Sequence, residues 1–438
     1  MSNPNTTDNA FQKAYTVFAG NPAAKTWLRP IQDRAFRAFA QAGFPTMRDE
    51  DWKYTNLAKV EARSATYLNA GPASADTDAT KTLLNELPLD PGHYTIVFAN
   101  GQFRADLSNM PVSEVGLHIE TLSGADEQSR QRIGEHLGRF ANVETFQLAA
   151  LNTAFLVDGL VIRVADGAEI SRPIHVVFIT DGKPVSVQPR ILINLGECSR
   201  TTVIEHYAGR GAGLTNAVTE VHCAPAAHLQ YIKLQEEDAE TYHLAAQYIR
   251  LDQDSRFDAV HVDFGARLAR NDLAVTLAGA GASANLHGLF IVDGDRHVDN
   301  HTRLDHLARQ TTSRESYRGI LSDRGRGVFN GKVIVHPGAD QSDAQLNNRN
   351  LLLSATAEVD TKPELEIYTD EVKCGHGSTT GQLDANAMFY LRARGIPEDQ
   401  ARRMLVAAFA AEVIDPIGPW AEAILQHVQN TLERCLPG

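Results

Sequence analysis

A cysteine and a histidine two residues apart are the pair of side chains in this sequence best suited to chemistry. Cys374 and His376 stand in the segment DEVKCGHG, residues 370–377. If this segment is extended, both side chains point to one face, because successive side chains of a strand alternate. A thiolate and an imidazole on one face suit iron or a sulfur-bearing intermediate. We expect Lys373 to favour the thiolate, since a nearby positive charge lowers the pKa of a thiol.

The C-x-H pair supplies at most half of a metal site. A tetrahedral site needs four ligands, so a second subunit would have to contribute the others. Gly375 and Gly377 carry no side chain and leave the backbone open to a close neighbour. The other reading of the pair, taken alone, is a buried thiol beside a surface histidine.

Common phosphate-binding and hydrolase motifs are absent from the sequence. Gly331-Lys332 resembles the end of a Walker A loop, but Val333 follows where the motif needs Ser or Thr. Residues 325–327, Gly-Arg-Gly, match the start of the G-x-G-x-x-G dinucleotide-binding motif, but Asn330 stands where the third glycine is required. Neither G-x-S-x-G nor H-E-x-x-H occurs. If ATP hydrolysis serves this protein, we expect another chain to perform it.

Four histidines lie close together in the sequence: His287, His297, His301 and His306. A metal site could be built from such residues, but no i, i+2 pair with a nearby Glu stands out among them. Solvent-facing histidines on a β surface are the favoured interpretation, because the ligand geometry that a metal demands is not visible.

The composition is that of an ordinary globular protein with an acidic surface. The chain has 438 residues, of which 43% are hydrophobic and 22% charged. This length indicates two or three domains. The formal net charge of -13 argues against a nucleic-acid partner, because a protein that neutralises phosphates needs a basic face.

The sequence contains no evident targeting or membrane segment. No run approaches the ~20 consecutive apolar residues of a membrane helix. Residues 1–10 are polar and lack the basic and apolar regions of a signal peptide. We therefore expect a cytoplasmic protein whose cysteines are thiols. The four cysteines are Cys198, Cys223, Cys374 and Cys435.

The elements that must position the C-x-H pair belong to a long β-rich region. From His93 onward, short apolar runs alternate with Gly, Asp, Asn and Pro, and no convincing helix interrupts them. Turn clusters near residues 167, 196, 226, 254 and 281 recur at intervals of about 28 residues, which is typical of a solenoid. We favour a stacked β-solenoid over a β-sandwich with evenly spaced turns.

Helices are predicted on both sides of the β region. Residues 21–43 have helical spacing, with Pro30 as a kink or break and Gly43 as the stop. Asp384 is a plausible N-cap for a helix that ends at Gly395. Two further helices follow, over about 397–414 and 419–434. In the first of these, Leu405, Phe409 and Val413 recur four apart, with small residues beside them: Ala401, Ala408 and Ala411.

Several spaced blocks resemble the SufB/SufD family of iron–sulfur cluster assembly proteins. They occur in the order typical of the family, between about residue 25 and residue 415, and are densest after residue 340. The blocks are GFPT (43–46), EDWKYT (50–55), QSDAQLNNRN (341–350), PELEI (363–367), KCGHGSTTG (373–381), FYLRARGI (389–396) and FAAE (409–412).

Within this family the chain is closer to the SufD branch than to SufB. SufB has a Glu shortly after the histidine, where this chain has Gly377, and it carries more cysteines. Gly375 departs from the Ser that is common in SufD between the cysteine and the histidine, which changes local backbone freedom.

The resemblance implies a fold and two partners. The family core is a right-handed parallel β-helix flanked by N-terminal and C-terminal helical domains, which agrees with the turn spacing. The resemblance further implies a non-catalytic scaffold that pairs with SufB through the β-helix ends and docks the ATPase SufC. No cofactor would be bound permanently, but a transient iron–sulfur cluster would form at the SufB–SufD interface.

Site residues also follow from the resemblance. His376 would be a ligand of the nascent cluster and Cys374 an accessory thiol, both shared with SufB. The helices after Asp384 match the region that docks SufC. There the residues expected to contact SufC are Tyr390, Arg392, Arg394, Met404 and Phe409, although packing within the chain is an equally good account of any one of them.

These observations define an expected organisation and its alternatives. We expect a mainly helical domain over 1–90, the β-helix core over 91–384 and a C-terminal helical domain over 385–438 that docks the ATPase. The alternative from another class is a β-helix enzyme of the polysaccharide-lyase type. A structural homodimer is a third reading, because an unpaired β-helix edge favours self-association.

Overall fold

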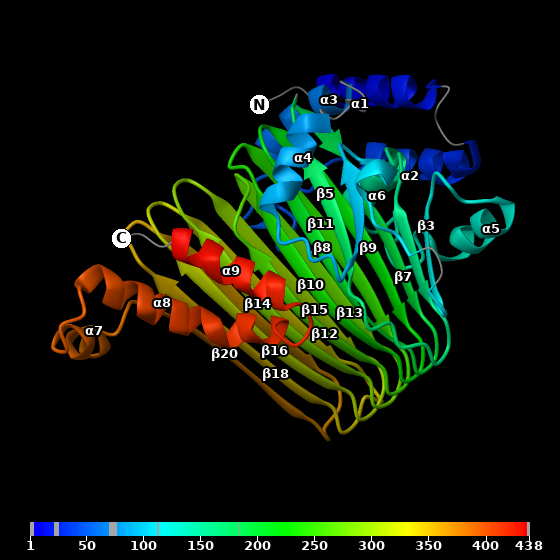
Figure 1. Ribbon diagram of the computed structural model, residues 1–438. Coiled ribbons are helices and arrows are strands. Elements are labelled where there is room, and N and C mark those ends of the chain that lie inside the picture. Colours follow the sequence, from blue (N-terminus) through cyan, green and yellow to red (C-terminus); the bar gives the residue numbers. More distant parts are fainter. Residues whose placement is uncertain (1–3, 22–25, 70–76, 112–113, 183, 436–438) are drawn as a thin grey trace.

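The centre of the molecule is a parallel β-solenoid (Figure 1). The computed structural model describes residues 4–21, 26–69, 77–111, 114–182 and 184–435. Two ten-stranded sheets run along the solenoid, and from β7 to β20 successive strands alternate between them. Each coil therefore contributes one strand to each sheet, which confirms the solenoid and rules out the β-sandwich.

The two sheets differ in the strands that they draw from each coil. Sheet A contains, in spatial order, β2 (Gln102–Phe103), β1 (Tyr94–Ala99), β5 (Ile174–Thr180), β8 (Arg200–Gly209), β10 (His228–Glu237), β12 (Arg256–Asp263), β14 (Ser283–Val292), β16 (Thr312–Leu321), β18 (Asp343–Leu352) and β20 (Lys373–Gly381). Sheet B contains β19 (Glu358–Ile367), β17 (Arg326–Val335), β15 (His297–His306), β13 (Leu268–Leu277), β11 (Thr241–Leu251), β9 (Gly213–Cys223), β7 (Arg190–Leu195), β4 (Leu160–Val164) and β3 (Leu117–Thr121), with β6 (Val185–Val187) beside β9.

The turns from sheet B to sheet A explain the spacing seen in the sequence. Seven of the eight turns contain a residue with positive φ, which reverses the chain tightly; the turn between β19 and β20 does not. Gly281, with φ of 73°, adopts this conformation without steric cost because it has no Cβ. The corresponding residues of the successive turns are Gly167, Cys198, Ala226, Asp254, Gly281, Gln310 and Gln341.

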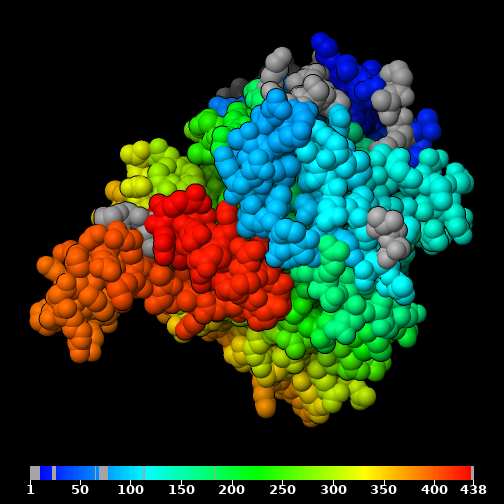
Figure 2. All heavy atoms as spheres, viewed as in Figure 1, coloured from blue at the N-terminus to red at the C-terminus, as the bar shows by residue number. Residues whose placement is uncertain are grey.

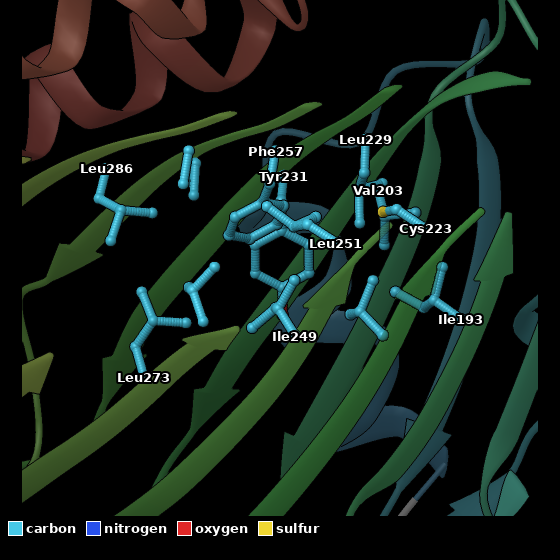
Figure 3. Close-up of a cluster of buried hydrophobic side chains, with 14 of the residues drawn as sticks. Ile193, Val203, Cys223, Leu229, Tyr231, Ile249, Leu251, Phe257, Leu273 and Leu286 are labelled. Carbon is cyan, nitrogen blue, oxygen red and sulfur yellow. The ribbon is translucent and has the colours of Figure 1, made fainter. Parts of the chain in front are cut away.

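Apolar side chains fill the space between the two sheets. Figure 3 shows Tyr231, Phe257 and Leu286 projecting into this space with residues from neighbouring coils. Strands of a solenoid are buried on the inner face along their whole length, so their inward positions repeat as buried residues in coil after coil. This continuous core fixes the register of the last coils, where the C-x-H pair lies.

The N-terminal helices cover the outer face of sheet B. Phe36 and Trp52 pack in one apolar cluster with Tyr242 and Leu268 of that face. The helix predicted over 21–43 is shorter than expected: α2 ends at Gly43, whose φ is 68°, but Pro30 lies in its first turn rather than at a kink. Residues 22–25 lie outside the described residues. The helical elements here are α1 (Pro4–Ala19), η1 (Thr26–Leu28), α2 (Arg29–Ala42), η2 (Glu50–Trp52) and α3 (Ala58–Asn69). The next helix, α4 (Thr77–Glu86), packs on sheet A instead, where Leu83 and Leu84 form a cluster with Val97 of β1 and with Val177 and Ile179 of β5.

The prediction of no helix after His93 was wrong. After the short η3 (Ala105–Leu107), α5 (Glu127–His136) and α6 (Gln147–Ala154) precede the first full coil. The Asp126 side chain caps α5 by accepting a hydrogen bond from Ser129 N at 2.8 Å. All residues of α6 from Ala149 onward are buried, so its sequence is a short apolar run that cannot be distinguished from a buried strand by periodicity.

The C-terminal helices are α7 (Ala385–Arg392), α8 (Glu398–Ile414) and α9 (Glu422–Cys435), with η4 (Asp415–Ile417) between the last two. The predicted N-cap is confirmed, because Asp384 accepts a hydrogen bond from Asn386 N at 2.8 Å. Of the three small residues noted beside Leu405, Phe409 and Val413, Ala401 is buried, Ala411 is half-buried and Ala408 is exposed. The face of α8 that is buried consists of Ala401, Val406, Ala410, Val413 and Ile414.

The C-terminal helices divide into an anchored part and a projecting part. The second half of α8 and all of α9 pack on the outer face of sheet A, whereas α7 and the start of α8 project from the body (Figure 2). Glu236 of β10 holds α9 by accepting hydrogen bonds from His427 at 3.0 Å and from His206 at 2.6 Å. Burial raises the pKa of Glu236, but these two bonds outweigh it and bring the pKa to about 2.

Candidate functional site

The C-x-H pair lies at the open end of the solenoid. Cys374 and His376 belong to β20, which is the last strand of sheet A, and β19 is the last strand of sheet B. Neither strand has a partner on its outer side among the described residues. The final coil therefore presents two unpaired edges and its own interior to whatever lies beyond it.

Both side chains share the inner face of β20. Cys374 is in register with Ala344, and His376 is in register with Leu346; both partners are buried in the solenoid core. Because side chains in register on neighbouring parallel strands point the same way, the pair faces the inside of the coil. Cys374 is half-buried against the core, and His376 is exposed at the open end.

The expected activation of the thiol by Lys373 was wrong. Burial raises the pKa of Cys374, and the negative charge of Asp343 adds to this, although a backbone hydrogen bond from Ala344 acts in the opposite direction. A half-buried thiol loses hydration of its thiolate, and Lys373 lies on the exposed outer face of β20. The thiol of the isolated chain is therefore protonated at neutral pH.

A hydrogen-bonded network that the sequence reasoning missed lies beside the pair. Thr361 donates to Asn348 Oδ1 at 3.0 Å, and its hydroxyl is 2.9 Å from that of Ser378. The three residues come from β19, β18 and β20, so the network ties the two sheets together at the open end. Ser378 could have been found, because it follows His376 by two positions and shares its face.

A buried acid also faces the interior near this end. Glu315 on β16 is in register with Leu346, which is in turn in register with His376. Its only side-chain partner among the described residues is the Thr302 hydroxyl, and Oε2 has none. Burial raises the pKa of Glu315 to about 7. No sequence signal marks this residue, because its burial depends on how the coils stack.

A groove of about 470 Å³ lies on the same coils, and its lining includes His376, Leu346 and Glu315 of the inner face as well as residues of the outer face. The bare backbone of Gly375 and Gly377 forms part of its lining, together with His287 and Asn347. A Cβ on Gly375 would lie 2.8 Å from the Gln345 amide oxygen. Gln345 thus occupies the space that the more usual serine would need, and because its side chain is flexible the departure is a small local change.

Three of the four clustered histidines take separate partners. His297 lies 3.1 Å from the Thr55 hydroxyl, and His301 pairs with Asp299 at 3.0 Å. His306 contacts two hydroxyls of its own coil, and burial lowers its pKa to about 4. The fourth, His287, is partly buried in the groove of about 470 Å³, and its Nδ1 has no hydrogen-bond partner among the described residues. Within the described ranges, no group of three or more His, Cys, Asp or Glu residues is arranged to hold a metal.

The residues expected to meet the ATPase lie on the projecting helices. Tyr390 and Met404 are 56% and 45% exposed, and Phe389 beside them is 74% exposed. The Arg394 guanidinium stacks at 3.7 Å over the Tyr390 ring, and Arg392 pairs with Glu398 at 3.1 Å. Large apolar side chains exposed together on one projection are typical of an interaction surface.

Phe409 differs from these exposed residues. It is half-buried, its carbonyl accepts a hydrogen bond from Arg318 Nη1 at 2.6 Å, and the Arg318 guanidinium lies 4.8 Å from its ring centroid. Arg318 also pairs with Glu412. Phe409 thus joins α8 to β16, and a groove beside it reaches Thr380 on β20. The open end and the projecting helices are connected through this contact.

Family models cover nearly the whole chain. Residues 178–409 match the family described as "SUF system FeS cluster assembly, SufBD core domain", and residues 10–176 match "SufBD protein N-terminal region". The division between the two models falls within β5, inside the solenoid. The described residues include no helix with the length and apolar character of a membrane span.

Individual relatives agree over full length. An iron–sulfur cluster assembly SufBD family protein of Synechocystis sp. is 31% identical over 90% of this chain and 86% of its own. The iron–sulfur cluster assembly protein SufD of Escherichia coli is 29% identical over 98% of this chain and 97% of its own. SufD of Bacillus subtilis is 22% identical with the same coverage of 98% and 97%.

Proposed function

This chain belongs to the SufBD family of SUF-system iron–sulfur cluster assembly proteins, and from this membership we propose that it is the SufD-type scaffold of a complex with SufB and SufC. The observation that carries the proposal is the open terminal coil with Cys374 and His376 on its inner face. A scaffold of this kind has no turnover of its own, and SufC supplies the ATP hydrolysis.

The terminal coil is the surface on which SufB would dock. The unpaired edges of β19 and β20 can accept strands from a second solenoid, and edge pairing supplies main-chain hydrogen bonds. Stacking the two ends would also cover the inward-facing Cys374 and His376. The same edges allow the isolated chain to form a homodimer.

The nascent cluster would form between the two subunits. His376 is the ligand offered by this chain, because its imidazole is exposed and makes no hydrogen bond to another described residue. Cys374 is an accessory thiol whose ionisation would depend on iron or on the partner, since a bound metal deprotonates a coordinating thiol. SufB supplies the missing ligands, and the cluster leaves as product.

The projecting helices would dock SufC. Tyr390, Met404 and the exposed Phe389 give this surface an apolar centre, with Arg392 and Arg394 beside it. Closure of a SufC dimer around ATP could then change the SufB–SufD arrangement, provided that SufC binds the two arrangements with different affinity. We expect the complex to work in the cytoplasm.

Copurification tests the proposal. The tagged chain should retain SufB and SufC from native lysate, and replacing His376 with Ala should abolish cluster assembly in cells while the complex still forms. His118→Ala is a matched control, because His118 is an exposed histidine on β3, outside the terminal coil. Normal activity of cluster-dependent enzymes in the His376→Ala strain would refute the ligand assignment, and failure to retain either partner would refute the scaffold role.

A further inference from the structure

A row of histidines on the outer face of sheet A has no part in the function proposed above. It begins at His427 on α9, passes through Glu236 on β10, and continues to His206 on β8 and His175 on β5. His93, directly before β1, adds a fourth ring. Because β10, β8, β5 and β1 are neighbours in sheet A, this histidine row joins the last helix of the molecule to the start of the solenoid.

Short contacts connect the members of the histidine row. The Glu236 carboxylate lies 2.6 Å from His206 Nε2 and 3.0 Å from His427 Nε2. On the other side of its ring, His206 Nδ1 lies 3.1 Å from His175 Nε2, and the two rings stack with 4° between their planes. The ring centroids of His175 and His93 are 6.1 Å apart. His175 and His206 are both 0% exposed, so their nitrogens depend on these partners rather than on bulk water.

The hydrogen bonds fix where the protons lie when the rings are neutral. The ionised Glu236 carboxylate can only accept, so His206 donates from Nε2 and its Nδ1 carries no proton. His175 must then donate from Nε2 to His206. The other nitrogen of His175, Nδ1, has no hydrogen-bond partner among the described residues. A proton added to His206 would force His175 to carry its own proton on Nδ1, where nothing accepts it.

The charge of the histidine row also limits how many protons it can hold. One imidazolium beside Glu236 forms an ion pair, but a second would lie against the first, because the ring centroids of His206 and His427 are 6.3 Å apart and like charges oppose each other. The remaining titratable groups near the row are Asp90 and Arg172 beside His93 and Cys435 near Glu236. The single carboxylate of Glu236 thus balances only one added proton.

Burial keeps the inner imidazoles neutral. It lowers the pKa of His175 well below the ordinary value of 6.5, and the neighbouring His206 adds to this effect. Burial also lowers the pKa of His93, although Asp90 acts in the opposite direction. The stability that these two groups contribute is therefore present above pH 6.5 and is lost as the pH falls below it. Any arrangement in which water reaches the rings takes up more protons.

We propose that the histidine row is an acid-sensitive latch, which holds α9 on sheet A and releases it when the row takes up protons. Release of α9 uncovers Glu236 and His206, because His427 contacts both. Since α9 follows α8 through η4, release also lets the projecting helices move. An effect on SufC rests on the docking role proposed above, whereas the latch itself does not.

Hydrogen exchange of the full-length chain at pH 7.5 and pH 5.5, measured by mass spectrometry, tests the latch. Protection factors remove the intrinsic effect of pH on exchange. In α9 they should fall by about tenfold, as expected when opening takes up one proton over the pH unit below 6.5, while the solenoid strands keep their protection. Constant protection of α9, or an equal loss in α9 and in the strands, overturns the proposal. Neither result depends on SufB or SufC.

His175→Gln distinguishes the latch from simple packing of α9. The glutamine amide can donate to a neutral His206 or, after rotation, accept from a charged one, but it does not titrate. The fall in α9 protection should therefore shrink to about threefold or less. His118→Gln is the matched control, because His118 is an exposed histidine on β3 outside the row, and it should keep the full fall.

Equal falls in His175→Gln and His118→Gln would overturn the latch. Thermal unfolding at pH 7.5 checks that His175→Gln folds. His93→Gln provides a second variant at the far end of the row, where the ring makes no hydrogen bond to His175. It should reduce the fall in α9 protection in the same direction, and an unchanged fall in both variants would show that the row does not control α9.

Discussion

At the scale of single residues, the acid inside the last coils has the clearest physical consequence. Burial raises the pKa of Glu315 from 4.5 to about 7, so its neutral form is favoured in the folded protein. The resulting contribution to stability is fully present below pH 4.5 and is lost as pH rises through 7. A difference of this size corresponds to about 3 kcal/mol.

We therefore expect Glu315→Gln to flatten the dependence of stability on pH. Glutamine keeps the shape and can still bond to Thr302, but it cannot ionise. Urea midpoints of the two proteins should be similar at pH 5, and the variant should be the more stable at pH 8. Glu358→Gln, at an exposed acid of β19, should leave the profile unchanged. Parallel profiles for wild type and Glu315→Gln would show that Glu315 is not buried as an acid.

At the scale of elements, the sequence predicted best those features that depend only on neighbouring residues, such as helix ends and turns. The cap at Asp384 and the stop at Gly43 depend only on nearby backbone groups, so both were predictable. The turns were predictable because the reversal from sheet B to sheet A recurs in every coil. The short helix α6 was not predictable, because its buried apolar run is equally compatible with a strand. Its packing against α2, β9 and β11 favours the helix.

The anchoring of α9 gives the element-scale prediction. His427→Ala removes one of the two imidazoles that bond Glu236 and leaves a buried carboxylate with a lost partner. Such a loss costs about 1–3 kcal/mol. We expect faster hydrogen exchange across α9, measured by mass spectrometry, with the solenoid strands unaffected. Gln426→Ala is the control, because the neighbouring Gln426 is exposed; equal exchange in both variants would show that the Glu236 contact does not hold the helix.

At the scale of the whole molecule, some residues of the site are neighbours in the sequence and others are separated by one or more coils. The C-x-H pair is local, so alternation along one strand was enough to place Cys374 and His376 on one face. The network of Thr361 and Asn348, and the acid Glu315, require the stacking of three strands from separate coils. That stacking depends on the register of the complete solenoid, which no single stretch of sequence encodes.

The open end also determines how the molecule should associate. Unpaired parallel strands with exposed backbone favour pairing with another chain, and lysine on an edge strand opposes it. We expect the isolated protein to form dimers through β19 and β20, with a mass that falls on dilution in light-scattering chromatography. Thr380→Lys on β20, at an exposed inward-facing position, should shift the equilibrium to monomer, because the ammonium would have to be buried between two stacked ends.

The same change should weaken copurification of SufB more than that of SufC, because Thr380 belongs to the terminal coil, whereas the exposed Tyr390 and Met404 lie on the projecting helices. Thr82→Lys on α4 is the control, because this exposed position lies away from the terminal coil and the change adds the same charge without blocking the edge. It should neither dissociate the dimer nor weaken copurification of SufB. If Thr380→Lys dissociates the dimer yet leaves SufB bound, the homodimer and the heterodimer would use different surfaces. If it affects neither, the open end is not an interface, and the cluster could not form against Cys374 and His376 in the way proposed.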